Sequence, residues 1–117
     1  MKLLIIEDEL IFRTHLKMQI ENAQLFEDIQ ETDEVNEALT LFKDLEPTHV
    51  ILDINLGQKI GGLELAKIFK KMSDARIIFI SAYNDLETMV AVAKIDPFAF
   101  LNKPVNFDIL LSLLQEN

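Results

Sequence analysis

The stretch LLIIEDEL, residues 3–10, joins a short aliphatic run to three adjacent carboxylates. Four aliphatic residues in a row are typical of a strand that is covered on both faces, as in a parallel sheet. Ionised carboxylates repel one another, and burial strengthens the repulsion. A strand that ends on Glu7, Asp8 and Glu9 therefore needs compensation, either from the fold or from a bound cation.

Composition sets the class of protein. The chain has 117 residues, half of them hydrophobic, which favours a globular protein with one core, and we expect a single domain over residues 1–117. It has no cysteine, which excludes disulfides and thiolate metal sites. With 20 acidic and 11 basic residues the net charge is −9, which argues against nucleic-acid binding by this domain. No apolar run approaches the length of a membrane span, and we expect a cytoplasmic protein with no membrane contact.

Short apolar runs alternate with helical patterns along the chain. The predicted strands are 2–7, 28–32, 48–53, 76–81 and 98–102. Between them, apolar residues recur every three or four positions, as on the buried face of a helix. This alternation predicts an open, mostly parallel α/β sheet that is doubly wound, with helices on both faces.

Each predicted helix has an apolar face and several have a candidate cap. We expect N-caps at Asp33, Asn84 and Asn106, and a last helix over 106–117. The predicted buried faces are Phe12, Leu16, Ile20 and Ala23; Val35, Ala38, Leu39 and Phe42; Leu63, Ala66, Phe69 and Met72; Leu86, Met89, Val90 and Ala93; and Phe107, Leu110, Leu111 and Leu114.

Unusual polar residues stand where these strands end. In open parallel sheets, ligands bind beyond the carboxyl ends of the strands. Taken singly, each residue has an ordinary structural explanation as a cap, a turn residue or a solvated charge. Their coincidence at one edge of the sheet predicts a site instead. The residues are Glu7 and Asp8 after the first strand, Asp53 at the end of the third, Ser81 at the end of the fourth, and Lys103 after the fifth, directly before Pro104.

The chemistry of this set favours phosphoryl transfer. Three carboxylates in one place call for a hard divalent cation, and oxygen ligands suit Mg²⁺. A phosphoryl group on Asp53 would have the metal, the Lys103 ammonium and the Ser81 hydroxyl around it. Positioning and charge neutralisation of this kind supply most of the catalysis of phosphoryl transfer.

With these residues, the whole chain resembles a response-regulator receiver domain of two-component signalling, of the chemotaxis-regulator type. The marks of the resemblance are Glu7-Asp8, Asp53 in ILDINL, Ser81-Ala82 after IIFI, and Lys103-Pro104. The resemblance implies a (βα)5 flavodoxin-like fold with a five-stranded parallel sheet of order 2-1-3-4-5. It also implies a switch that is phosphorylated by a sensor histidine kinase or a phosphotransfer protein, with no enzymatic activity beyond its own phosphorylation and dephosphorylation.

The resemblance assigns roles to individual residues. Asp53 would be the phosphoacceptor and, with Asp8 and the backbone carbonyl of Asn55, would bind Mg²⁺. Glu7 would reach the metal through water, while Ser81 and Lys103 would hold phosphoryl oxygens. Two further features complete the set: Phe100 stands at the position of the family's switch aromatic, and the Lys103–Pro104 peptide is a candidate for the cis form.

The implied output is a change of partner or dimer affinity. It would act through the face built from the fourth helix, fifth strand and fifth helix, within residues 84–114. The downstream partner and the oligomeric state stay open. So does the question of whether the chain is a complete regulator or the first part of a longer one.

The chain also departs from the commonest family pattern. The loop after Asp53 is one residue longer, with Gly57 where proline is frequent. Phe100 lacks the hydroxyl of the commoner tyrosine, and the bulky Tyr83 follows Ser81 by two residues. We expect these differences to affect the lifetime of the phosphoryl group. His15 and His49 fall outside the predicted edge and are expected to have structural roles.

Two alternative functions remain open from the sequence. One is a small Mg²⁺-dependent phosphatase with an aspartyl-phosphate intermediate, although 117 residues leave little room for a substrate-covering cap. The other is an interaction module of the same fold that works without phosphorylation. A small phosphodonor with Mg²⁺ separates the three functions, since a switch keeps the label, an enzyme turns over and a module takes up nothing.

Overall fold

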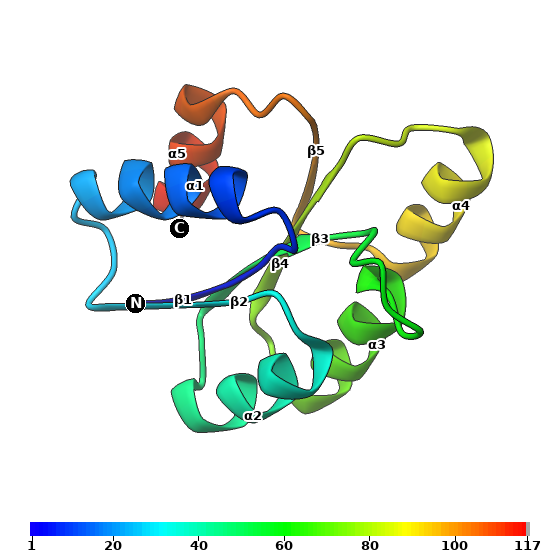
Figure 1. Ribbon diagram of the computed structural model, residues 1–117, viewed down its shortest axis with the longest axis horizontal. Coiled ribbons are helices and arrows are strands. Elements are labelled where there is room, and N and C mark those ends of the chain that lie inside the picture. Colours follow the sequence, from blue (N-terminus) through cyan, green and yellow to red (C-terminus); the bar gives the residue numbers. More distant parts are fainter. Residues whose placement is uncertain (117) are drawn as a thin grey trace.

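Strands and helices alternate strictly along the chain in the computed structural model, which describes residues 1–116 (Figure 1). The strands are β1 (Lys2–Ile6), β2 (Asp28–Thr32), β3 (His49–Asp53), β4 (Arg76–Ser81) and β5 (Ala99–Asn102). The helices are α1 (Leu10–Asn22), α2 (Val35–Leu45), α3 (Gly62–Met72), α4 (Leu86–Ile95) and α5 (Phe107–Gln115). All five predicted strands are present, with limits that shift by at most one residue. The last helix ends at Gln115, and residue 117 of its predicted range lies outside the described residues.

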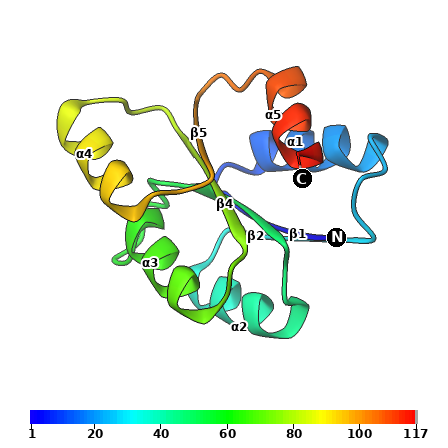
Figure 2. The same cartoon turned by 180° about the vertical axis from the view of Figure 1, so that it is seen from behind.

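The five strands form one parallel sheet of order β2-β1-β3-β4-β5, which confirms the predicted doubly wound fold. Helices α1 and α5 cover one face of the sheet, and α2, α3 and α4 lie on the other side (Figures 1 and 2). The chain crosses β1 when it passes from β2 to β3, so the strand order reverses there. The carboxyl ends of β1 and β3 therefore border the crevice where such folds bind ligands.

The aliphatic residues of β1 contribute side chains to two hydrophobic cores, one on each face of the sheet. Leu4 and Ile6 belong to a core beneath α2, α3 and α4, whereas Leu3 and Ile5 belong to a core beneath α1 and α5. All four side chains are fully buried. Because successive side chains of a strand point to opposite faces, a strand covered on both faces needs apolar residues at every position.

The helix caps differ from prediction at two of three positions. Asn106 caps α5 as expected, through a hydrogen bond from the Ile109 N–H to its side chain. Helix α2 is capped by Glu34 instead of Asp33, and α4 by Asp85 instead of Asn84. In both cases an acidic side chain one residue later accepts hydrogen bonds from free N–H groups of the first turn. Its negative charge also interacts favourably with the positive end of the helix dipole.

The predicted buried face of α4 is wrong. Leu86 and Val90 are 81% and 45% exposed, and the buried residues of this helix are Val92 and Ile95. Helix α4 is apolar on nearly every side, so the spacing of its apolar residues could not identify the buried face. The result is an exposed apolar surface on α4.

Among residues 1–116, no helix combines the length and the apolar character that crossing a membrane requires.

Candidate functional site

Three carboxylates converge at the carboxyl ends of β1 and β3. One oxygen from each of Glu7, Asp8 and Asp53 lies within 4.8 Å of the others. The parallel pairing of Ile6 with Leu52 brings the next residues of the two strands, Glu7 and Asp53, side by side. Glu7 and Asp53 are buried, whereas Asp8 is exposed. The cluster is therefore closed towards the core and open towards solvent on the Asp8 side.

Lys103 supplies the positive charge of this cluster. Its Nζ donates to Glu7 Oε1 at 2.6 Å and to Asp53 Oδ2 at 3.1 Å, and it lies 4.9 Å from the centre of the Phe12 ring. Its backbone N–H donates to the Ser81 carbonyl at 2.8 Å, and the peptide bond to Pro104 is cis. Burial alone would lower the pKa of this ammonium, but the hydrogen bonds to Glu7 and Asp53 outweigh burial and raise it.

The negative charge of a buried Glu7 carboxylate is only partly compensated by its neighbours. Burial is the main cause that raises the pKa of its carboxyl to about 8, and a hydrogen bond with Asp53 adds to it, while Lys103 acts in the opposite direction. One ammonium balances one of the two buried carboxylates, so the other favours its protonated form. A divalent cation beside the open Asp8 carboxylate would supply the missing charge. The donor set, which consists of hard oxygen atoms, fits Mg²⁺.

One backbone N–H and one side-chain ammonium hold the two oxygens of Asp53 in a fixed direction. The Asn55 N–H donates to Asp53 Oδ1 at 3.1 Å, and Lys103 binds Oδ2. Asn55 is exposed and stands at the start of the loop that joins β3 to α3. The loop therefore orients the carboxylate without covering it.

Ser81 lies at the end of β4, where it is fully buried. Its Oγ accepts a hydrogen bond of 2.9 Å from the backbone N–H of Tyr83. The hydroxyl is thus part of the turn after β4, and the Tyr83 side chain is 54% exposed. Sequence reasoning placed Ser81 at this edge, and the structure adds the turn in which its hydroxyl is held.

Phe100 lies in β5, away from the carboxylates. It pairs in register with Phe79 of β4 and is half-buried against the core beneath α2, α3 and α4. The side chain is therefore neither free in solvent nor fully enclosed.

Two glycines, Gly57 in the β3–α3 loop and Gly62 at the first position of α3, allow this segment to approach the cluster closely. A Cβ added to Gly62 would meet the Asp53 carbonyl oxygen at 2.1 Å, and Gly57 has φ +65° with its added Cβ 3.8 Å from Asp8 Oδ2. Only glycine fits the first position, and glycine is favoured at the second. The adjacent glycines Gly61-Gly62 are a sequence signal that could have indicated a close backbone approach here, although the sequence does not show which atom lies opposite.

Arg13 is a neighbour of the cluster that sequence reasoning missed. From α1 it donates to the Glu7 carbonyl at 2.8 Å, and its Nε lies 3.8 Å from Glu31 of β2. The Arg13 side chain is only 12% exposed. It ties the end of β1 to α1 and β2, a role that nothing in the periodicity of α1 indicates.

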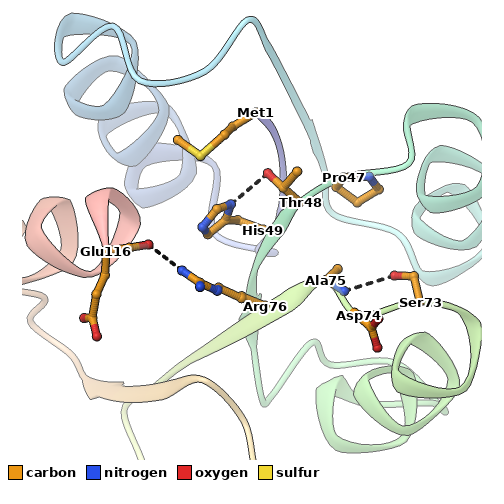
Figure 3. A pocket seen from close by; sticks show the side chains of 9 residues that line it. All are labelled: Met1, Pro47, Thr48, His49, Ser73, Asp74, Ala75, Arg76 and Glu116. Carbon is orange, nitrogen blue, oxygen red and sulfur yellow. Dashed lines mark hydrogen bonds between the residues drawn. The ribbon is translucent and has the colours of Figure 1, made fainter.

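His49 lies at the opposite edge of the sheet, at the start of β3. It lines a cavity of about 470 Å³ together with Met1, Arg76 and Glu116. Figure 3 shows these side chains around the cavity. The His49 Nδ1 lies 2.8 Å from the Thr48 hydroxyl oxygen, whereas its buried Nε2 has no partner among the described residues. Burial, the Arg76 guanidinium and the terminal ammonium lower the pKa of this imidazole. It is remote from the carboxylates, as predicted.

Comparisons with known proteins agree with this geometry. Residues 3–115 match the family described as the response regulator receiver domain. Among curated relatives, the sensory transduction protein LytT of Bacillus cereus is 31% identical over 99% of this chain, and the chemotaxis protein CheY of Listeria monocytogenes is 30% identical over 99%. The match covers 46% of the LytT protein and 97% of the CheY protein. The chain thus spans about half the length of several relatives that it matches.

Solved structures give the same result. The signal receiver domain of a modulated diguanylate cyclase from Desulfovibrio desulfuricans superposes with a TM-score of 0.89 at 30% identity, covering 97% of this chain and 90% of that one. A response regulator protein from Burkholderia pseudomallei has a TM-score of 0.84 at 28% identity, covering 99% of this chain and 67% of that one. That structure is described as containing a phosphorylated aspartic acid and a calcium ion.

Proposed function

The chain belongs to the family of response regulator receiver domains, whose function is phosphorylation-dependent signalling, and on this basis we propose that Asp53 is its phosphoacceptor. The observation that carries the proposal is the contact of Lys103 Nζ with Asp53 Oδ2, inside a cluster of three carboxylates. The phosphorylated aspartic acid of the Burkholderia protein supports it, since that protein shares the fold at 28% identity. The donor would be a sensor histidine kinase or a phosphotransfer protein.

In the proposed reaction, an Asp53 carboxylate oxygen forms a bond to phosphorus while the bond from phosphorus to the donor's imidazole nitrogen breaks. The Asn55 N–H and Lys103 orient the carboxylate before the reaction. Lys103 and Ser81 then offer an ammonium and a hydroxyl to the phosphoryl oxygens. Glu7, Asp8, Asp53 and the Asn55 carbonyl would hold Mg²⁺, which when bound neutralises charge on the transferred group.

We place the output on α4, β5 and α5. Ser81 is buried and held by Tyr83, so it reaches a phosphoryl group on Asp53 only if the turn after β4 moves. Such a movement would change the packing around Phe100, which is half-buried on the adjacent strand. The exposed apolar side chains of this face, Leu86, Val90 and Ile109, are suited to a protein partner or a second copy of the chain.

This function implies a cytoplasmic protein whose reactions are limited to its own phosphorylation and dephosphorylation. The net charge of −9 favours a protein partner over nucleic acid. Phosphorylation would act by shifting the population of two states that both exist beforehand.

Intact mass after incubation with acetyl phosphate and Mg²⁺ tests the proposal. We expect one added phosphoryl group on the wild type and none on Asp53→Asn. The matched control is Asp74→Asn, an exposed aspartate at the opposite edge of the sheet, which should label normally. Undiminished labelling of Asp53→Asn would exclude Asp53 as the acceptor.

A further inference from the structure

Gln58 connects two loops at the carboxyl edge of the sheet. Its side-chain amide donates to the Asp33 carbonyl at 2.8 Å and, more weakly, to the Leu56 carbonyl at 3.4 Å. Its side-chain oxygen accepts the Val35 N–H at 3.0 Å. One side chain of the β3–α3 loop therefore binds backbone groups on both sides of Glu34, the cap of α2.

The Val35 N–H is a group that needs such a partner. It belongs to the first residue of α2, where no preceding turn offers a carbonyl. Glu34 accepts the next two N–H groups, those of Asn36 and Glu37, and leaves Val35 to Gln58. Val35 is itself buried, so loss of Gln58 would leave this donor poorly satisfied.

The same loop carries atoms of the candidate site. The Asn55 N–H binds Asp53, and a Cβ added to Gly57 would lie 3.8 Å from Asp8 Oδ2. At its far end, Gly62 is fixed by its close approach to the Asp53 carbonyl and by its N–H, which donates to Ile54. Between Gly57 and Gly62, Gln58 is the residue whose side chain binds another element of the sheet's edge. It therefore restrains the middle of a loop that is otherwise held at its ends.

We propose that Gln58 is a positioning residue for phosphoryl transfer, because it holds the β3–α3 loop in the conformation that presents Asn55 and Asp53 to Mg²⁺. This inference rests on the proposed function. If the loop is ordered in advance, metal binding does not have to supply the ordering free energy. By reciprocity, the metal should also strengthen the contact between Gln58 and the start of α2.

The variants are Gln58→Ala and Gln58→Asn, the second of which keeps the amide but is one methylene too short. Gln30→Ala is the control, because it truncates an exposed glutamine of β2 whose side chain bonds only to Asp28 among the described residues. We expect both Gln58 variants to raise the half-saturating Mg²⁺ concentration for labelling by about fivefold, roughly the factor for one net hydrogen bond. The rate at saturating Mg²⁺ should stay within about twofold of the wild type, since the reacting groups are unchanged.

Amide hydrogen exchange gives a second readout that does not depend on labelling. Without metal, Val35 should exchange faster in Gln58→Ala, while Ile109, which is bound by the cap of α5, should not change. Addition of Mg²⁺ should slow Val35 exchange in the wild type and in Gln30→Ala but not in Gln58→Ala.

The outcomes separate the two proposals. Faster Val35 exchange with an unchanged half-saturating Mg²⁺ concentration would reduce Gln58 to a cap of α2 and overturn its positioning role. An equal loss of rate at all Mg²⁺ concentrations would overturn it as well. A wild-type chain that neither binds Mg²⁺ nor labels at Asp53 would instead overturn the proposed function, and this inference with it.

Discussion

The two edges of the sheet are built alike but carry different sets of charged groups. At both edges a backbone hydrogen bond extends the pairing of two strands by one residue, from the Lys103 N–H to the Ser81 carbonyl at the carboxyl edge and from the Arg76 N–H to the Thr48 carbonyl at the amino edge. The carboxyl edge holds three carboxylates and one ammonium. The amino edge holds a buried imidazole near a guanidinium and the terminal ammonium. We therefore attribute the proposed reactivity of the carboxyl edge to the charged groups at its strand ends, since the backbone geometry is shared.

Replacing the cationic side chain at each edge with methionine should give the largest difference in labelling rate between the two edges. Lys103→Met removes a donor that would face the transferred phosphoryl group, and we expect labelling by acetyl phosphate to fall by about 10²–10³-fold. Arg76→Met at the other edge should leave the rate within about twofold of the wild type, because Arg76 contacts none of the carboxylates. Initial rates from intact mass measure both. Similar rates in the two variants would remove Lys103 from the reaction.

The Gly62→Ala substitution tests how tightly the carboxyl edge is built. Its Cβ would overlap the Asp53 backbone, so we expect a loss of about 3 kcal/mol in the free energy of unfolding. Gly57→Ala meets no atom closer than 3.8 Å and should lose about 1 kcal/mol, owing to its positive φ. Urea denaturation gives both values. If the two variants lose the same stability, the loop can move away from Asp53 more easily than the structure indicates.

Mg²⁺ should stabilise the folded chain through the carboxyl edge alone. At a concentration ten times its dissociation constant, Mg²⁺ adds about 1.4 kcal/mol by mass action. We expect Asp8→Ala to lose the resulting rise in melting temperature and Asp74→Ala, at the amino edge, to keep it. An Asp8→Ala variant that Mg²⁺ stabilises as much as the wild type would exclude Asp8 as a ligand.

The sequence predicted the residues next to strands better than those within helices and loops. Glu7, Asp53 and Lys103 each stand beside a strand end, and parallel strands bring such positions to one edge. The buried side of α4 could not be predicted, because apolar residues surround this helix and only its contacts select one face. Leu86 is consequently exposed although it matches the spacing of a buried residue.

Contacts made by long side chains across loops were not predictable either. Gln58 binds residues 23 and 25 positions away, and Arg13 reaches from α1 to β2. The position of a glutamine or an arginine in the sequence does not reveal which distant group its side chain will contact. The α2 cap lies at Glu34 instead of Asp33 for the same reason, because the Asp33 carbonyl accepts a hydrogen bond from the distant Gln58 side chain.

The smallest expected effect concerns pH and the amino edge. His49 has its pKa lowered from 6.5 by burial, by Arg76 and by the terminal ammonium, with Glu27 and Glu116 as nearby carboxylates. The unfolded chain therefore takes up a proton at His49 near pH 6.5, while the folded chain does so only at lower pH. Between these two values the unfolded state binds more protons, so stability is complete above pH 6.5 and falls as the pH drops below it.

We expect this loss to be weaker in His49→Gln, which has no group that titrates at this position, and unchanged in His15→Gln, which replaces an exposed histidine of α1. Urea midpoints between pH 5 and pH 7.5, measured with and without Mg²⁺, provide the data. Because His49 lies at the edge remote from the carboxylates, its contribution to the pH dependence of stability should be the same with and without Mg²⁺. If the difference between wild type and His49→Gln disappears when Mg²⁺ is added, the two edges are coupled through β3, and their separation into one reactive and one structural edge is wrong.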